Sequence, residues 1–206
     1  MSGGSAAKAD ILAAVRNALG PSPAVPDVPR GYRTAGTLQP DVGLFAERVA
    51  EYRATVHRVA AAELGAKLAE LSRGRTGVPP GFPFDGIEDA GLSVAELDAL
   101  DTVITGCALA IADTGTIVLD GGAASGRRAL TLVPDHHVCI VRAEDIVPSV
   151  PDAVAALAEA AKEGRPITLV SGPSATSDIE LDRVEGVHGP RTLDVIVFWD
   201  GRLRRT

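Results

Sequence analysis

The spacing of apolar positions divides this chain into a helix-rich first half and a strand-rich second half. Between residues 41 and 71 apolar side chains recur at helical spacing, with charged side chains opposite, so one or two helices are expected there. A shorter amphipathic pattern at residues 8–19 predicts another helix, which a Gly-Pro pair ends. A further helix is expected to begin at Ser93, because Ser93 and Glu96 have the spacing of a capping box.

Beyond residue 100 the pattern changes to short apolar runs rich in β-branched residues, which are typical of strands. The runs are 103–104, 109–111, 117–119, 130–133, 138–141, 167–170 and 193–198. An alanine-rich helix is expected at 151–162. Because the runs lack the alternation of a half-exposed sheet, they predict an α/β fold with one mixed, partly parallel sheet and helices on both faces.

Two segments rich in proline and glycine interrupt these patterns. Residues 21–30 contain four prolines and few apolar side chains, which is the composition of a semi-extended linker. Residues 74–91 break every period and are expected to be loop. We therefore expect an N-terminal helical arm and linker at residues 1–30 and one domain at 31–206. The apolar stripe of the arm helix could rest on its own domain or on a partner subunit.

Charge and hydropathy narrow the classes of partner. The formal net charge is -7, and no run of Lys and Arg interleaved with aromatic residues offsets it, which argues against nucleic-acid binding. The opening residues lack the basic and continuous apolar regions expected of a secretory signal, and no apolar stretch approaches the roughly 20 residues needed to span a membrane. The expectation is a cytoplasmic protein whose partners are small molecules or proteins.

Cysteine and histidine usage argues against a metal centre in this chain. The two cysteines, Cys107 and Cys139, lie in apolar stretches and are expected to be small core residues. Neither forms a Cys-x-x-Cys motif, and the pair His136 and His137 has no second cluster of ligands at metal spacing. No Gly-x-Gly-x-x-Gly turn follows a strand. The expectation is that the chain itself holds no metal and no cofactor.

The first candidate for chemistry is the segment Asp113-Thr114-Gly115-Thr116, between two apolar runs. It can be a hairpin turn in which Asp113 accepts from free amides and Gly115 supplies a positive φ. It can also be a polar rim, with two hydroxyls and a carboxylate held by rigid strands.

The second candidate, residues 171–180, follows directly on an apolar run. A glycine turn at the carboxyl end of a strand presents free backbone amides, which favour anions. Its polar or small residues include Gly172, Pro173, Ser174, Thr176, Asp178 and Glu180. The spacing of Ser177 and Glu180 also fits a capping box, so part of this polarity could serve only to begin a helix.

The third candidate is residues 186–191, which contain a glycine-flanked histidine, His188, and a cation, Arg191. The arginine suits a carboxylate or phosphate, and the histidine could exchange a proton with a substrate. The alternative is a solvated loop histidine that bonds a backbone carbonyl.

These segments together resemble the LUD-domain family. The resemblance runs from about Leu100 to Phe198 and rests on residues 111–116, Leu132-Val133-Pro134 leading to His137, Gly172-Pro173-Ser174, 176–180 and 186–191. It implies that residues 31–206 are a LUD domain, with a fold similar to the NagB, ribose-5-phosphate isomerase and CoA transferase superfamily. It also implies a role in oxidising L-lactate to pyruvate alongside iron-sulfur partner proteins, which would carry the iron-sulfur clusters.

We expect the three segments to form one site, because loops that leave the same edge of an α/β sheet gather where ligands bind. The expected catalytic residues are Asp113, Glu180 and His188. The expected ligand-binding residues are Thr114, Gly115, Thr116, His137, Gly172, Pro173, Ser174, Thr176, Asp178 and Arg191. Such a site suits a non-redox subunit of a lactate-oxidising system that binds a small carboxylate or other anion. It equally suits a stand-alone isomerase, hydrolase or transferase acting on a phosphorylated or acyl substrate, or a ligand-binding module. The sequence leaves open whether the chain is itself an enzyme.

Overall fold

The computed structural model describes residues 3–173 and 189–199 and divides the chain into two compact units, Met1–Arg33 and Thr34–Thr206. The first unit contains the predicted arm helix, α1 (Gly3–Leu19), and an exposed stretch at residues 20–33. Leu12 and Val15 of its apolar stripe are exposed. Among the helices within the described residues, none has the length and apolar character required to cross a bilayer.

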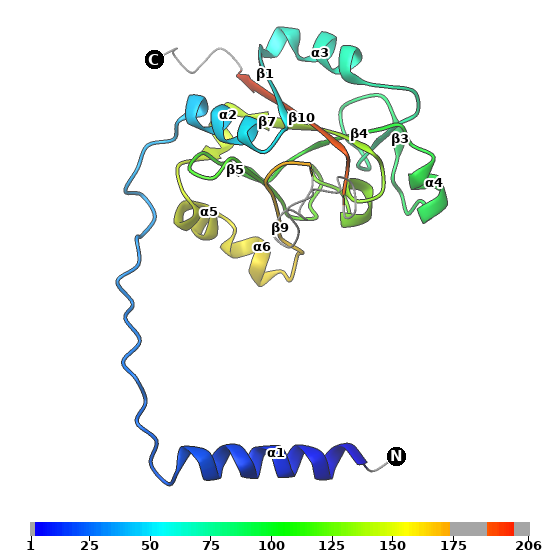
Figure 1. The fold of residues 1–206 in the computed structure, drawn as a ribbon. Coiled ribbons are helices and arrows are strands. Elements are labelled where there is room, and N and C mark those ends of the chain that lie inside the picture. Colours follow the sequence, from blue (N-terminus) through cyan, green and yellow to red (C-terminus); the bar gives the residue numbers. More distant parts are fainter. Residues whose placement is uncertain (1–2, 174–188, 200–206) are drawn as a thin grey trace. The chain divides into compact units, whose positions relative to one another are not determined.

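The second unit is built around a six-stranded sheet in which every pairing is parallel (Figure 1). In spatial order its strands are β1 (Thr55–Ala60), β10 (Thr192–Trp199), β7 (His136–Arg142), β4 (Thr102–Gly106), β2 (Thr76–Val78) and β3 (Ile87–Glu88). β10 therefore lies between β1 and β7, which are far from it in sequence. β7 and β10 are buried along most of their length, as their uninterrupted apolar runs predict.

The prediction of a single sheet is wrong, because the remaining strands form a second sheet of four. Its order is β8 (Ile146–Val147), β5 (Leu109–Ile111), β6 (Thr116–Leu119) and β9 (Thr168–Val170). β5 and β6 form an antiparallel hairpin, and β9 is also antiparallel to β6. The fold class, a mixed α/β protein with helices flanking a mostly parallel sheet, is confirmed.

The buried clusters define how the layers stack. Leu68 of α3 (Leu64–Leu71) packs with Val138 and Ile196 on one face of the large sheet. The opposite face packs against the second sheet and α2 (Val42–Glu51). The outer face of the second sheet is covered by α5 (Val150–Ala156) and the residues that lead into α6 (Ala158–Lys162). The order of layers is therefore helix, sheet, sheet, helix.

Three local predictions also need correction. Residues 41–71 contain strand β1 between α2 and α3, and the supposed loop at 74–91 contains the short strands β2 and β3. The run at 130–133 is not a strand, because residues Arg128–Thr131 form a one-turn 3₁₀ helix, η2. The other 3₁₀ turns are η1 (Ala61–Glu63) and η3 (Ala143–Asp145).

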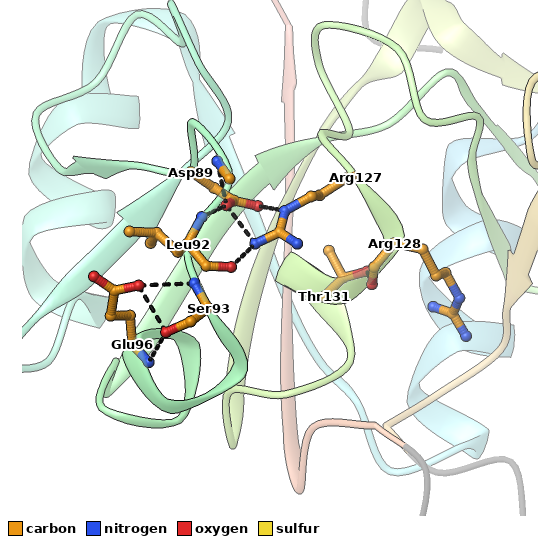
Figure 2. Close-up of polar contacts among 8 residues, drawn as sticks. Asp89, Leu92, Ser93, Glu96, Arg127, Arg128 and Thr131 are labelled. Atoms are coloured by element: carbon orange, nitrogen blue, oxygen red, sulfur yellow. Dashed lines mark hydrogen bonds and ion pairs between the residues drawn. The ribbon is translucent and has the colours of Figure 1, made fainter.

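The capping box that begins α4 (Val94–Asp98) is confirmed. The Ser93 Oγ accepts from the Glu96 amide at 3.3 Å, and the Ser93 amide donates to the Glu96 carboxylate at 2.8 Å (Figure 2). Leu97 of α4 and Leu100, which follows the helix, pack against Leu130 of η2, and this packing holds the turn beside the large sheet.

Candidate functional site

A cavity of about 70 Å³ lies where β7 and β10 begin and where β9 ends. Its wall combines apolar, hydroxyl and charged side chains. It is lined by Leu119, Arg128, Thr131, Leu132, His137, Leu169, Val170, Ser171, Gly172, Pro173, Gly189 and Pro190. Segments more than 50 residues apart in sequence, such as Arg128 and Gly189, therefore contribute to one space.

His137 is the second residue of β7 and is almost fully buried, with 2% of its surface exposed. Its Nε2 is 2.8 Å from the Thr105 Oγ1 on the neighbouring strand β4. Burial, together with the nearby charges of His136 and Arg128, lowers the pKa of His137 to about 3. The imidazole is therefore neutral near pH 7 and serves as a hydrogen-bonding group rather than a charge.

A chain of hydroxyls leads from the β5–β6 turn to the cavity. The Thr114 and Thr116 Oγ1 atoms are 2.7 Å apart, and the Thr116 Oγ1 is 2.7 Å from the Ser171 Oγ. Because Ser171 lines the cavity, the predicted segment 113–116 is joined to the predicted segment that begins at 171.

Both turns rest on the end of α2, and their glycines allow this close approach. Gly172 has φ +88°, and a Cβ there would lie 2.7 Å from the Tyr52 carbonyl oxygen. Gly115 has φ +59°, and a Cβ there would lie 2.6 Å from the Arg48 carbonyl carbon. A larger residue at either position would have to move the α2 backbone or open the turn.

Arg128 and Thr131 line the cavity from η2, and sequence reasoning did not single them out. Figure 2 shows the neighbouring arginines pointing in opposite directions, Arg127 toward Asp89 and Arg128 away from it. Partial burial lowers the pKa of Arg128 from its ordinary value, although a guanidinium stays charged at neutral pH. The signal in the sequence is the glycine-rich segment 121–128, which follows β6 and ends in two arginines.

Arg127 holds this segment in place through a buried carboxylate. Its Nε is 2.6 Å from Asp89 Oδ2 and its Nη2 is 2.7 Å from Asp89 Oδ1, while Nη2 also donates to the Leu92 carbonyl (Figure 2). Burial raises the pKa of Asp89, but the hydrogen bonds from Arg127 and from the Leu92 and Gly91 amides outweigh burial and hold it below its usual range. Arg127 is thus a structural anchor, whereas Arg128 faces the cavity.

The structure brings together part of the predicted site. His137, Gly172 and Pro173 line the cavity, and Thr114 and Thr116 reach it through Ser171. The predicted residues Ser174, Thr176, Asp178, Glu180 and His188 lie outside the described residues.

The other three predicted residues lie near these segments without lining the cavity. Gly115 packs on α2. Asp113 is exposed in the turn, and its carboxylate adds to Glu51, the main cause, in raising the pKa of Arg48. Arg191 is also exposed, and its Nη1 is 3.3 Å from the Asp135 Oδ2. Arg128 is therefore the arginine that lines this cavity among the described residues.

The cavity also lies at a different sheet edge from the one expected. The sequence predicts a site made of loops at the carboxyl ends of parallel strands. Among the segments that line the cavity, only Ser171–Pro173 follows the end of a strand, β9 of the second sheet. His137 and Gly189–Pro190 lie at the amino ends of β7 and β10 in the large sheet. The second sheet, which the sequence did not reveal, is what brings these segments together.

A separate polar cluster lies on the opposite face of β7. His57 Nε2 is 2.7 Å from Asp194 Oδ1, and His136 Nε2 is 2.8 Å from Asp194 Oδ2. The His136 Nδ1 is 3.2 Å from the Thr102 Oγ1, so four strands are joined by side-chain bonds. Burial raises the pKa of Asp194, but the two histidines outweigh it and hold this pKa below its ordinary value.

The layered α/β architecture and the gathered segments define a recognisable class of protein. The sequence model of the LUD domain matches residues 94–198, which include every described segment that lines the cavity. The chain belongs to the LUD-domain family.

Comparison with individual proteins shows which members of this family the chain resembles. The chain is 50% identical over 163 residues to lactate utilization protein C of Deinococcus radiodurans, covering 74% of this chain and 77% of that protein. It is 35% identical over 117 residues to lactate utilization protein C 1 of Bacillus mycoides, covering 54% of this chain and 50% of that one. A crystal structure of a DUF162 family protein from Deinococcus radiodurans has a TM-score of 0.62 and 44% identity, over 75% of this chain and 94% of that chain. This kinship supports a role in lactate utilization.

Proposed function

We propose that this chain is a non-redox subunit of a cytoplasmic L-lactate-oxidising system, and that its cavity binds a small carboxylate. The observation that carries the proposal is the 50% identity to lactate utilization protein C of Deinococcus radiodurans over 77% of that protein's length. The cavity adds a chemical argument, because a guanidinium, two hydroxyls and a neutral imidazole suit a small anion with further polar groups.

The redox chemistry is assigned to iron-sulfur partner proteins. Oxidation of a 2-hydroxy acid to a 2-oxo acid releases electrons that a carrier must accept. Iron-sulfur clusters are usually held by four cysteine thiolates, whereas this sequence contains two cysteines. Cys139 is buried in the core and Cys107 packs against the same core, which suits a packing role.

The titration properties of the cavity favour binding over acid-base catalysis. Of the residues that line it in the described part of the chain, His137 and Arg128 are the titratable ones. His137 remains neutral down to about pH 3 and Arg128 remains cationic, so neither changes its charge near neutral pH. The described lining of the cavity therefore suits anion binding.

The test is genetic and biochemical together. Deletion of the gene in its host should abolish growth on L-lactate, and the full chain should restore growth. Anaerobic affinity purification of the tagged chain from a cytoplasmic fraction should recover iron-containing proteins, identified by mass spectrometry and iron analysis. Unchanged growth on L-lactate, or turnover of a phosphorylated or acyl substrate by the isolated chain, would contradict the proposal.

A further inference from the structure

Arg128 and Thr131 reach the same space because of the local helix type. A 3₁₀ helix has three residues per turn, so side chains at positions i and i+3 point in the same direction. Arg128 and Thr131 are the first and last residues of η2, and the Thr131 Oγ1 donates to the Arg128 carbonyl at 3.3 Å. Leu130 between them is fully buried. The turn therefore presents one cation and one hydroxyl to the cavity.

Arg128 also marks the junction of two cavities. A smaller cavity, of about 10 Å³, is lined by Leu119, Gly121, Ser125, Gly126, Arg128, Thr131, Pro166 and Thr168. It shares Leu119, Arg128 and Thr131 with the larger one. A group bound against the guanidinium would thus lie between the Ser171–Pro173 wall and the glycine-rich loop that follows β6.

The backbone of the turn that carries Arg128 is held in place by the neighbours of Arg128. The residue before it, Arg127, is bonded to the buried Asp89, and Leu130 packs against Leu97 and Leu100. Among the residues that the structure describes, no carboxylate lies within ion-pair distance of the Arg128 guanidinium. Among these residues, an anion that binds the guanidinium therefore displaces no carboxylate from it.

Among the described residues that line the larger cavity, the polar groups other than Arg128 are uncharged. Thr131 and Ser171 supply hydroxyls, and His137 is neutral. One cation with several neutral donors and acceptors is complementary to a ligand with one negative charge and one further oxygen. The volume of about 70 Å³ is far below the 300–1,000 Å³, roughly, of sites for drug-sized ligands, which favours a ligand of a few non-hydrogen atoms.

We infer that Arg128 is the anion-binding residue of this site and that the ligand is a small 2-hydroxy or 2-oxo monocarboxylate. This deepens the proposed function and rests on it. The carboxylate binds the guanidinium beside Thr131, and the oxygen on the second carbon bonds to Ser171 or His137. In this assignment Arg128 supplies the positive charge that the sequence motifs predict for Arg191.

Isothermal titration calorimetry on the full-length chain near neutral pH tests this inference. The probes are L-lactate, pyruvate, propionate and inorganic phosphate. We expect L-lactate or pyruvate to bind, and propionate, which lacks the second oxygen, to bind about 2- to 10-fold more weakly. Phosphate should bind more weakly than either. Arg128→Gln should weaken binding of the preferred acid by about 10- to 150-fold, the range for a bond to a charged group.

Two further variants separate charge from geometry. Arg128→Lys keeps the charge but loses the planar fork, so it should bind with intermediate affinity. Arg142→Gln is the matched control, because Arg142 is an exposed arginine at the opposite end of β7 and pairs with Glu144 at 3.4 Å. It should bind as tightly as the unmodified chain. Circular dichroism of each variant verifies that it is folded.

The binding measurements test this inference, and a different experiment tests the proposed function. Unchanged affinity in a folded Arg128→Gln variant overturns the assignment of Arg128. Preference for phosphate over both 2-substituted acids overturns the ligand class. Failure of the folded chain to bind any probe overturns the whole inference, whereas the requirement of the gene for growth on L-lactate tests the proposed function independently.

Discussion

At the amino-terminal edge of the large sheet, two adjacent histidines of β7 have opposite surroundings. His136 lies on the face covered by α3, where both of its ring nitrogens are bonded, to Asp194 and to Thr102. His137 lies on the face toward the second sheet, where it is bonded to Thr105 and lines a cavity. The same residue type therefore belongs to a hydrogen-bonded polar cluster on one face and lines a cavity on the other.

Because of this difference, mutations on the two faces of β7 should affect different properties of the protein. Successive side chains of a strand point to opposite faces, so neighbours in sequence can belong to unrelated environments. A change in the His57, Asp194 and His136 cluster should affect mainly stability. A change in the cavity should affect mainly ligand binding.

The largest effect is expected from Asp194→Ala. Asp194 is buried and accepts from two histidines, so its removal leaves both imidazoles without their partner. The free energy of unfolding should fall by about 3 to 5 kcal/mol, measured by denaturant titration. His57→Ala, at the more exposed end of the cluster, should cost only about 1 kcal/mol. A loss below 1 kcal/mol for Asp194→Ala would show that the cluster does not stabilise the sheet.

The second effect is a loss of stability in mild acid that depends on His137. The unfolded chain binds a proton at His137 below about pH 6.5, whereas the folded chain does so only near pH 3. Stability attributable to this residue is therefore complete above pH 6.5 and should fall by up to about 3 kcal/mol between pH 6.5 and 4.

Denaturant titrations across this pH range provide the measurement. His137→Gln, which can keep a bond to Thr105, should flatten the dependence. Asp194 does not interfere, because its pKa lies below its ordinary value of 3.8 and its contribution is lost only in stronger acid. Parallel pH profiles for both proteins would contradict this prediction.

A smaller effect is expected from Gly172→Ala, which alters the wall of the cavity. The new Cβ meets both a positive φ and the Tyr52 backbone, so the free energy of unfolding should fall by about 2 kcal/mol. Gly164→Ala is the matched control, since Gly164 has φ +71° and no atom within 4 Å of the added Cβ. Equal losses for the two variants, in thermal or denaturant unfolding, would show that contact with α2 contributes nothing.

The smallest effect is expected from Arg191→Ala. Arg191 and Asp135 are both mostly exposed, and exposed ion pairs contribute from about 0 to 1 kcal/mol. The free energy of unfolding should change by less than about 0.5 kcal/mol, and carboxylate affinity by less than about twofold. If calorimetry instead showed a loss of affinity as large as that of Arg128→Gln, Arg191 would have to be included in the binding site.

The sequence predicted the elements of this fold better than their arrangement. The runs at β7 and β10 are apolar enough to indicate two-sided burial, but apolar character does not reveal whether a helix or another sheet covers a strand. In β1, residues spaced to suit a helix instead face the core from a strand, because pairing with β10 overrides local periodicity. Leu130 is buried as an apolar run predicts, but within a 3₁₀ turn.

The candidate site was likewise predicted in part. Gly172 and Pro173 could be named because they belong to a glycine turn after an apolar run, whereas His137 was named through the family resemblance. Arg128 could not be distinguished from Arg127, since the two differ only in direction and that direction depends on Asp89, 38 residues earlier in the chain. The residues that share the cavity with Arg128 are fixed by the packing of two sheets, which no local motif encodes.

The position of β10 also constrains how the protein can be made. This strand is synthesised after the nine other strands of the described residues, yet it lies between β1 and β7, and β1 has all of its described pairing with it. A nascent chain that has not yet extruded residues 192–199 from the ribosome has two unsatisfied strand edges and no Asp194 to join its histidines. Because Gly189 and Pro190 immediately precede β10, the cavity too is incomplete until that moment. Folding to the ligand-binding state therefore requires β10 to have left the ribosome, and exposure to chaperones or to aggregation is concentrated in the interval before this strand inserts.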